Sequence, residues 1–244
     1  MWGEIMPRFF IDAAPAEGIT LSGETAAHIG RSLRMRVGDE LVLCHGGVDY
    51  LCRIGAMTSD EVRCEVLSSS PCENEPSLEL TLFQALPKGD KMEFIIQKAV
   101  ELGVSRIVPF ISERCVSRPD PKSLAKKQER WQKIAEGAAM QSGRGIIPEV
   151  CGAVSFEECL RLAAAQDISY FFYELGGLSL TRQPPVGERR VGMIIGSEGG
   201  FSPEEASAAE QAGLLTASLG RRILRCETAP LAAATALLIL TGNM

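Results

Sequence analysis

The first third of the chain alternates short apolar runs with glycine-bearing turns. The turns fall at Gly38-Asp39 and Gly46-Gly47, between stretches in which apolar and polar positions alternate. This pattern is typical of half-buried strands joined by tight turns, so it predicts a small β-barrel. Four strands are predicted, at residues 8–11, 40–44, 48–54 and 61–66.

A different pattern begins after residues 68–77 (SSSPCENEPS), a polar, proline-bearing segment with the composition of a linker. We place the domain boundary there, giving domains of residues 1–74 and 75–244. In the second domain, strands alternate with helices, which predicts an α/β fold with a mostly parallel sheet. The strands are expected at residues 78–86, 106–111, 169–173 and 190–195 and near Ala217, and the helices at residues 91–102, 123–141, 156–165 and 203–212 and through Leu240.

The helix predictions depend on the spacing of apolar residues. Met92, Ile95, Ile96 and Val100 recur at intervals of three and four, as expected for one buried helix face. A helix is also predicted at residues 25–33 of the first domain. Its apolar side would carry Ala26, Ile29, Gly30 and Leu33.

The composition narrows the class of protein. Hydrophobic residues make up 45% of the 244 positions and charged residues 23%, which is ordinary for a globular protein and excludes disordered and fibrous classes. The longest apolar stretch, residues 231–240, is shorter than the roughly 20 residues that span a bilayer. The chain also opens without an apolar run behind a basic end. We therefore expect a cytoplasmic protein without a membrane partner.

A metal site is not expected. The eight cysteines form no C-x-x-C pair, and the two histidines, His28 and His45, are too few for a conventional zinc site without such pairs. Most of the cysteines fall within apolar patterns, where a reduced thiol behaves as a small hydrophobic side chain.

The formal net charge of −6 conceals an uneven distribution. Residues 1–75 hold six Lys and Arg against twelve Asp and Glu, whereas residues 88–145 hold twelve against seven. A local positive field on an acidic protein is enough to attract a polyanion. On charge alone, however, solvated helix faces explain the basic residues equally well.

One glycine-rich motif, VGMIIGSEGGFSPEE at residues 191–205, joins a predicted strand to a helix. Ser202 and Pro203 suit the N-cap and the first position of that helix. Small residues at the carboxyl end of a strand let a flat ligand approach the backbone closely. The spacing matches neither a dinucleotide fingerprint nor a P-loop. A plain strand-to-helix turn remains the alternative.

Two further clusters concentrate basic residues. In SLGRRILRCETAP, residues 218–230, three arginines precede a very apolar helix, and each needs a partner such as Glu227, a phosphate or a carboxylate. In residues 85–118, basic side chains at strand ends and helix starts would share one rim if the strands are parallel. The basic side chains of this rim are Lys88, Lys91, Arg114 and Arg118. Arg144 lies on a later glycine turn.

Together these motifs are specific. The chain resembles the 16S ribosomal RNA uridine-N3 methyltransferases of the SPOUT, or α/β-knot, superfamily over nearly its whole length. Ser197 stands where that family usually has proline, which keeps the glycine loop small but makes it less rigid. Residues 1–5 precede the point at which family members commonly begin. The shared motifs are PRFF, HIGRSLRMRVGD, LPKGDKME, IQKAVELGV, SERCVSR, RWQKIAEGAAMQSGR, IGSEGGFSPEE and LGRRILRCETAPLAA.

The resemblance implies a PUA-like N-terminal barrel, a C-terminal sheet with a deep trefoil knot, and a homodimer with active sites at the subunit interface. It also implies S-adenosylmethionine (SAM) as the cofactor and 16S ribosomal RNA of the small ribosomal subunit as the partner. The default rule against threaded chains would have predicted an unknotted sheet. The SAM-binding positions carried over are Leu175, Gly176, Gly196, Glu198, Gly199, Gly200, Leu219, Gly220, Ile223, Leu224, Arg225, Thr228 and Ala229.

For the chemistry, we expect Glu198 near the methyl donor or the N3 proton and Arg225 in the catalytic step, because a carboxylate attracts a sulfonium and a cation repels it. RNA phosphates are expected to meet Arg8, Arg34, Arg36, Lys88, Lys91, Arg114, Arg118, Arg144 and Arg222. The alternatives are a ribose 2′-O-methyltransferase, an enzyme acting on tRNA, or an RNA-binding assembly factor without catalysis. A nucleotide-dependent oxidoreductase ranks last because its fingerprint is missing.

Overall fold

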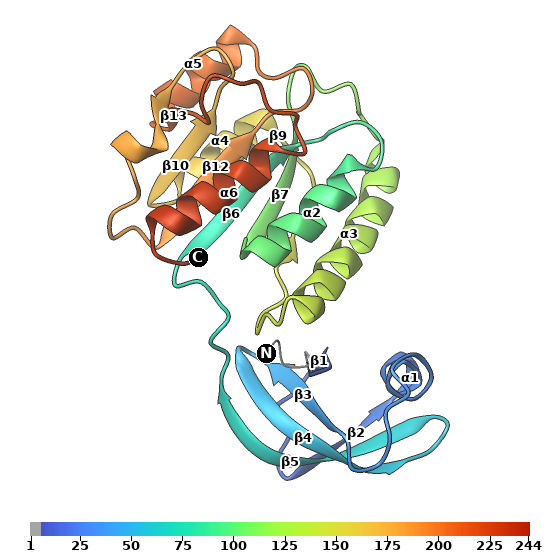
Figure 1. Cartoon of the computed structure of the whole chain (residues 1–244). Coiled ribbons are helices and arrows are strands. Elements are labelled where there is room, and N and C mark those ends of the chain that lie inside the picture. The colour runs from blue at the N-terminus through green and yellow to red at the C-terminus, as the bar shows by residue number, and fades with distance from the viewer. Residues whose placement is uncertain (1–5) are drawn as a thin grey trace. The chain divides into compact units, whose positions relative to one another are not determined.

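The structure is a computed structural model that describes residues 6–244, so the predicted N-terminal extension, residues 1–5, lies outside the described residues. The chain divides into two compact units (Figure 1). The first unit comprises residues 6–75 together with Met140–Ile146, and the second comprises Pro76–Ala139 and Ile147–Met244. The first unit therefore includes a short segment from far along the sequence.

The first unit is built on a five-stranded sheet of order β1-β3-β4-β5-β2, in which β1 pairs with β3 in parallel and the other pairs are antiparallel. Its core is lined by alternate strand residues such as Leu41, Leu43, Ile54 and Val62, all almost fully buried. The strands are β1 Arg8–Phe10, β2 Gly18–Ser22, β3 Glu40–His45, β4 Val48–Met57 and β5 Glu61–Pro71.

The linker prediction was wrong for its first half. Residues 68–71 continue β5, with Ser68 opposite Leu51 and Pro71 opposite Val48 of β4. A register shift at Leu51/Cys52 lets the pairing continue into this polar stretch. Proline is tolerated here because β2 pairs only with residues 61–65 of β5, so the end of the strand is an edge on that side.

The helix predicted at residues 25–33 is shorter and changes type. It begins as α1, Gly23–Ala27, and continues as a π-helical turn, η1, His28–Ser32. Leu33 donates its backbone N–H to the His28 carbonyl five residues earlier, and this wider turn shifts the register. As a result Ile29 is buried in the core, whereas Leu33 is 41% exposed and does not share that side.

The second unit has an eight-stranded sheet in which every observed strand pair is parallel, so the α/β prediction is confirmed. The main order is β11-β13-β10-β12-β6-β7-β8, with β9 paired to β7. The strands are β6 Glu79–Ala85, β7 Arg106–Ile111, β8 Glu149–Val150, β9 Val154–Ser155, β10 Ile168–Phe172, β11 Leu178–Ser179, β12 Arg190–Ile195 and β13 Leu215–Ser218.

Helices cover this sheet on both faces (Figure 1). Helix α6 packs against β6, β12 and α2, while α4 packs against β7, β10 and β12. No helix within residues 6–244 combines the length and apolar character needed to cross a membrane. The helices are α2 Lys91–Leu102, α3 Pro121–Gln141, α4 Phe156–Ala164, η2 Leu180–Arg182, α5 Pro203–Gln211 and α6 Ala229–Leu240.

Candidate functional site

The second unit holds a cavity of about 420 Å³ at the carboxyl ends of three neighbouring strands, β10, β12 and β13. In a parallel sheet these ends meet at one edge, which is where open α/β sheets bind ligands. The segments that follow the strands form most of the wall. The lining residues are Lys91, Phe172, Tyr173, Glu174, Ile195, Gly196, Ser197, Glu198, Gly199, Gly200, Ala217, Ser218, Leu219, Gly220, Arg222, Ile223, Leu224, Arg225, Cys226 and Ala229.

Ten of the residues expected to bind the cofactor line this cavity. Leu175, Gly176 and Thr228 do not line it, although Leu175 directly follows the lining residue Glu174 and Thr228 directly precedes Ala229. The motifs missed the strand-end residues Phe172, Tyr173 and Ala217, which the parallel pairing brings to the cavity, and Ile195 lies in the IGSEGGFSPEE motif but was not among the expected positions. The ten are Gly196, Glu198, Gly199, Gly200, Leu219, Gly220, Ile223, Leu224, Arg225 and Ala229.

The glycine loop between β12 and α5 is anchored at its far end by a capping box. The Ser202 hydroxyl accepts from the Glu205 N–H at 3.2 Å, and Glu205 Oε2 accepts from the Ser202 N–H at 3.0 Å. The other oxygen of Glu205 accepts from the backbone N–H of Glu113 at 2.8 Å. The buried Glu205 therefore ties the start of α5 to the segment after β7.

Within that loop the glycines serve different purposes. Gly200 adopts a φ of +63°, a left-handed conformation that favours glycine, and its N–H donates to the Ser197 carbonyl at 3.0 Å. A Cβ on Gly199 would lie 2.8 Å from Arg114 Cβ and 3.0 Å from the Arg114 carbonyl oxygen. Gly199 is therefore required by its close contact with Arg114.

Lys91 joins two acidic side chains at the cavity. Its Nζ lies 2.9 Å from Glu198 Oε1 and 3.3 Å from Glu227 Oε2. The backbone N–H of Lys88 also donates to Glu198, at 3.2 Å to Oε1. Lys91 was expected to meet RNA phosphate, but the structure gives its ammonium group these two carboxylates as partners.

These contacts decide the charge of the carboxylates. Partial burial acts to raise the pKa of Glu198, but hydrogen bonds from Lys91 and from backbone N–H groups outweigh it, so the pKa is lowered. The same balance, with a hydrogen bond from the Cys226 thiol, lowers the pKa of Glu227. Both groups are thus carboxylates at neutral pH, and Lys91, whose pKa is raised, is an ammonium.

The arginines of the LGRRILR segment do not pair with Glu227, the intramolecular partner considered from the sequence, since that carboxylate contacts Lys91. Arg222 and Arg225 line the cavity and are exposed, whereas Arg221 is exposed and does not line it. Ile223, between them, is 76% exposed. The segment therefore presents cations and an apolar side chain at the cavity.

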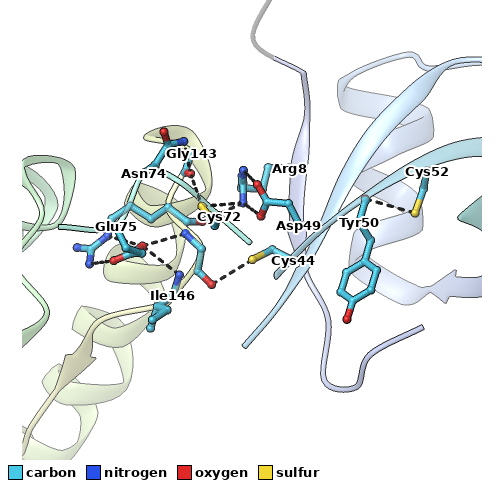
Figure 2. Close-up of polar contacts among 12 residues, drawn as sticks. Arg8, Cys44, Asp49, Tyr50, Cys52, Cys72, Asn74, Glu75, Gly143 and Ile146 are labelled. Carbon is cyan, nitrogen blue, oxygen red and sulfur yellow. Dashed lines mark hydrogen bonds and ion pairs between the residues drawn. The ribbon is translucent and has the colours of Figure 1, made fainter. Parts of the chain in front are cut away.

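Arg8 and Arg144 are corrections to the expected RNA contacts, and Figure 2 shows Arg8 with its partner Asp49 and the Glu75 side chain. The Arg144 side chain is 3% exposed, and its Nη2 lies 2.6 Å from Glu75 Oε2. The Arg8 side chain is 9% exposed, donates to both oxygens of Asp49, and reaches the Arg144 carbonyl at 3.2 Å. Both guanidinium groups bind partners inside the first unit, where they hold Met140–Ile146 against the rest of that unit.

The remaining basic candidates are exposed. Arg34 and Arg36 lie in the first unit, with Arg34 at a φ of +56°. In the second unit, Arg114 donates to the Gly199 carbonyl at 3.2 Å, and Arg118 donates to the Glu113 carbonyl at 2.8 Å. Lys88 is exposed and lies three residues before α2 begins at Lys91. The structure thus leaves these groups available at the surface of their units.

Two family models match the chain. An RNA methyltransferase domain matches residues 73–238, and an RNA methyltransferase PUA domain matches residues 21–67. The first match contains the whole cavity described above. The second falls entirely within the first unit.

Curated relatives and solved structures agree with these matches. The ribosomal RNA small subunit methyltransferase E of Bacillus subtilis is 35% identical over 95% of this chain and 96% of its own length. The protein of the same name from Mesomycoplasma hyopneumoniae is 32% identical over 92% of this chain and 95% of its own. A crystal structure of ribosomal RNA small subunit methyltransferase E from Neisseria gonorrhoeae, bound to SAM, is 34% identical, with a TM-score of 0.87 over 96% of this chain and 98% of that chain.

Proposed function

The chain belongs to the ribosomal RNA small subunit methyltransferase E family, as its motifs predicted, and we propose that it transfers a methyl group from SAM to N3 of a uridine in 16S ribosomal RNA. The observation that carries the proposal is the cavity at the strand ends of the methyltransferase domain. Ten of the thirteen residues carried over from the family's SAM site line it. The two alternatives, a non-catalytic assembly factor and an oxidoreductase, account less well for the gathering of these ten residues around one cavity.

The cavity fits SAM in size and chemistry. Its volume of about 420 Å³ lies within the range of roughly 300–1,000 Å³ that is usual for small-molecule pockets. Gly220, where an added Cβ would meet nothing within 4 Å, leaves backbone open to a flat adenosine, and Ile223 and Leu224 supply an apolar wall. SAM bound there supplies an electrophilic methyl group on a sulfonium.

The protein's own contribution is to orient the base and to stabilise charge. A uridine N3 normally carries a proton and takes part in pairing, so the base must be unpaired or extruded before it reacts. As N3 loses its proton, negative charge develops on the uracil carbonyl oxygens, and Arg225 is the cavity cation we assign to that charge. In-line placement of the two reactants can contribute roughly 7–11 kcal/mol.

Glu198 is assigned to the methyl donor and not to proton removal. The sequence left both roles open. A carboxylate whose pKa is lowered by an ammonium partner is a weak base, but it keeps its negative charge. That charge attracts a sulfonium.

RNA recognition is assigned to exposed cations on both units. Arg34 and Arg36 would serve on the PUA domain, and Lys88, Arg114, Arg118 and Arg222 on the methyltransferase domain. Arg114 also contacts the glycine loop through the Gly199 carbonyl, so it connects an RNA contact with the cofactor site. Arg8, Arg144 and Lys91 are removed from the set because each has intramolecular acidic partners.

The proposal extends to architecture. Family membership supports domains of residues 1–74 and 75–244, a deep trefoil knot around the cofactor, a homodimer and action in the cytoplasm, where ribosomal subunits are found. The dimer is further supported by α6, a helix apolar on nearly every face on which Ile239 and Leu240 remain 58% and 37% exposed.

Mass spectrometry of 16S ribosomal RNA from cells lacking this protein tests the proposed target. We expect the loss of one N3-methyluridine and its return when the gene is restored. Loss of a ribose 2′-O-methyl group or of a tRNA modification would instead support the nearest rivals. If RNA modification is unchanged in the deletion strain, a non-catalytic assembly factor becomes the better interpretation of this protein.

A further inference from the structure

The contacts of Lys91 connect three parts of the chain that are far apart in sequence. Lys91 is the first residue of α2, Glu198 lies in the glycine loop after β12, and Glu227 lies just before α6. We call these three side chains the charge cluster. Both carboxylates approach the same ammonium nitrogen within 3.3 Å.

The cluster carries one net negative charge, because two carboxylates share one ammonium. It is partly shielded from water: the side chains of Lys91, Glu198 and Glu227 are 35%, 28% and 20% exposed. Lys91 and Glu198 line the cavity, and Glu227 directly follows the lining residue Cys226. A charge in such a place acts on a ligand more strongly than one in open solvent.

SAM and its product differ in charge at one atom. SAM carries a sulfonium, and S-adenosylhomocysteine carries a neutral thioether once the methyl group has left. The net negative charge of the cluster is attracted to the positive sulfur of SAM and finds no charge on the thioether sulfur of the product. The same cluster would therefore favour the methyl donor at binding and release the product after transfer.

We propose that Lys91, Glu198 and Glu227 form a specificity-determining cluster that makes the cavity prefer the cationic methyl donor over its neutral product. This inference rests on the proposed function, since it assumes that the cavity binds SAM. It assigns Lys91 a positioning role: Lys91 keeps two neighbouring acidic groups charged and holds them at the cavity. It also gives Glu227 a role that no motif indicated.

Other titratable and charged groups lie near the cluster or line the same cavity. The Cys226 thiol lies 3.9 Å from Lys91 Nζ and donates to Glu227, and burial raises its pKa to about 12, so it is uncharged. The nearby Lys88 contacts Glu198 through its backbone N–H. Glu174, Arg222 and Arg225 line the same cavity and are exposed, and Arg114 lies against Gly199.

Calorimetric titration of the full-length protein with SAM and with S-adenosylhomocysteine tests the inference. Glu198→Gln and Glu227→Gln each remove one negative charge while keeping the shape of the side chain, so the cluster becomes neutral. We expect each to weaken SAM binding by roughly threefold to tenfold and to change S-adenosylhomocysteine binding by less than about twofold. Lys98→Met is the matched control, because Lys98 pairs with Glu101 on the same helix and does not line the cavity.

Lys91→Met allows a second measurement, the pH dependence of SAM affinity, which a purely structural role of Lys91 would not change. Without the ammonium group the two carboxylates repel each other and their pKa values rise, so a proton is taken up as the pH falls. SAM affinity should then decline between about pH 7 and pH 5, while S-adenosylhomocysteine affinity stays level. In the wild type both carboxylates stay ionised over this range and SAM affinity should be flat, and Lys91→Arg should restore that flat profile.

The outcomes separate this inference from the function on which it rests. If the wild-type protein binds neither compound, the proposed function fails and the inference with it. If the wild type binds SAM but the Glu198 and Glu227 variants lose both compounds in parallel, or lose neither, the proposed function stands and the charge cluster is refuted.

Discussion

At the scale of single residues, the role of an arginine depends on the acidic groups that the fold brings beside it. Arg144 and Arg225 both lie in motifs shared with the family, and from the sequence we expect an RNA contact for Arg144 and a part in catalysis for Arg225. The structure buries Arg144 against Glu75 and leaves Arg225 exposed at the cavity. The two should therefore respond to substitution in different ways.

Arg144→Ala is expected to destabilise the first unit without altering RNA contacts directly. Removing one partner of a buried ion pair leaves Glu75 uncompensated, which typically costs about 3–5 kcal/mol. Chemical denaturation measures the loss in the free energy of unfolding. Arg63→Ala is the control. The Arg63 side chain is 71% exposed and its ion pair with Glu61 is long, at 3.9 Å, so this substitution should change stability little. Equal stability of the Arg144 variant and the wild type would contradict a structural role.

Arg225→Ala should lower kcat with little change in RNA affinity. If Arg225 stabilises charge on the uracil oxygens, its loss removes an interaction made mainly in the transition state, and about a 100-fold drop is expected. Single-turnover methylation and RNA binding are measured on the same preparations. Arg221→Ala is the comparison, as Arg221 is an exposed neighbour outside the cavity. A rise in the RNA dissociation constant with kcat unchanged would move Arg225 to the phosphate contacts.

At the scale of elements, the glycine loop is shaped by its neighbours as much as by a ligand. Gly199→Ala should displace the loop from the Arg114 segment, because the added Cβ would lie 2.8 Å from Arg114 Cβ. Overpacking of this kind costs about 1–3 kcal/mol, so the melting temperature should fall together with SAM affinity. Gly137→Ala is the control: it lies in α3 with nothing within 4 Å of an added Cβ. There alanine should raise stability by about 0.5–1 kcal/mol. A Gly199 variant with the wild-type melting temperature would contradict this account.

The sequence could predict the elements whose patterns are long and regular. Helix α2 begins at Lys91 and ends at Leu102, as its apolar spacing indicated, and β12 matches its predicted bounds. The pattern could not reveal the two-residue strands β8, β9 and β11, because so few residues show no periodicity. The π-helical turn at His28–Ser32 depends on a hydrogen-bond choice that local spacing does not specify.

The candidate site was predictable where a motif was local and unpredictable where the fold joins distant segments. Local motifs identified the glycine loop and the LGRRILR segment. Phe172 and Ala217 reach the cavity only because β10 and β13 pair in register. The charge cluster likewise unites residues more than 100 positions apart, so no spacing rule could have linked Lys91 with Glu198.

At the scale of the whole molecule, the proposed homodimer makes a direct prediction. Ile239→Lys would place a charge on the exposed apolar side of α6, and a charge is costly to desolvate in a contact between subunits. Light scattering at micromolar concentration should show a dimer for the wild type and a shift to monomer for this variant. Val37→Lys, at a 61% exposed position of the first unit, should leave the dimer intact. A wild-type protein that is monomeric would contradict the dimer.

A reconstituted reaction tests most directly the proposal that this chain methylates N3 of a uridine in 16S ribosomal RNA. Purified protein, SAM with an isotopically labelled methyl group and unmodified 16S ribosomal RNA are incubated, and the digested nucleosides are separated by mass spectrometry. We expect labelled N3-methyluridine at one site, from RNA that is either free or assembled in the small subunit. Label on a ribose 2′-oxygen, label on tRNA alone, or no transfer from either form of the RNA by a protein that binds SAM would contradict it.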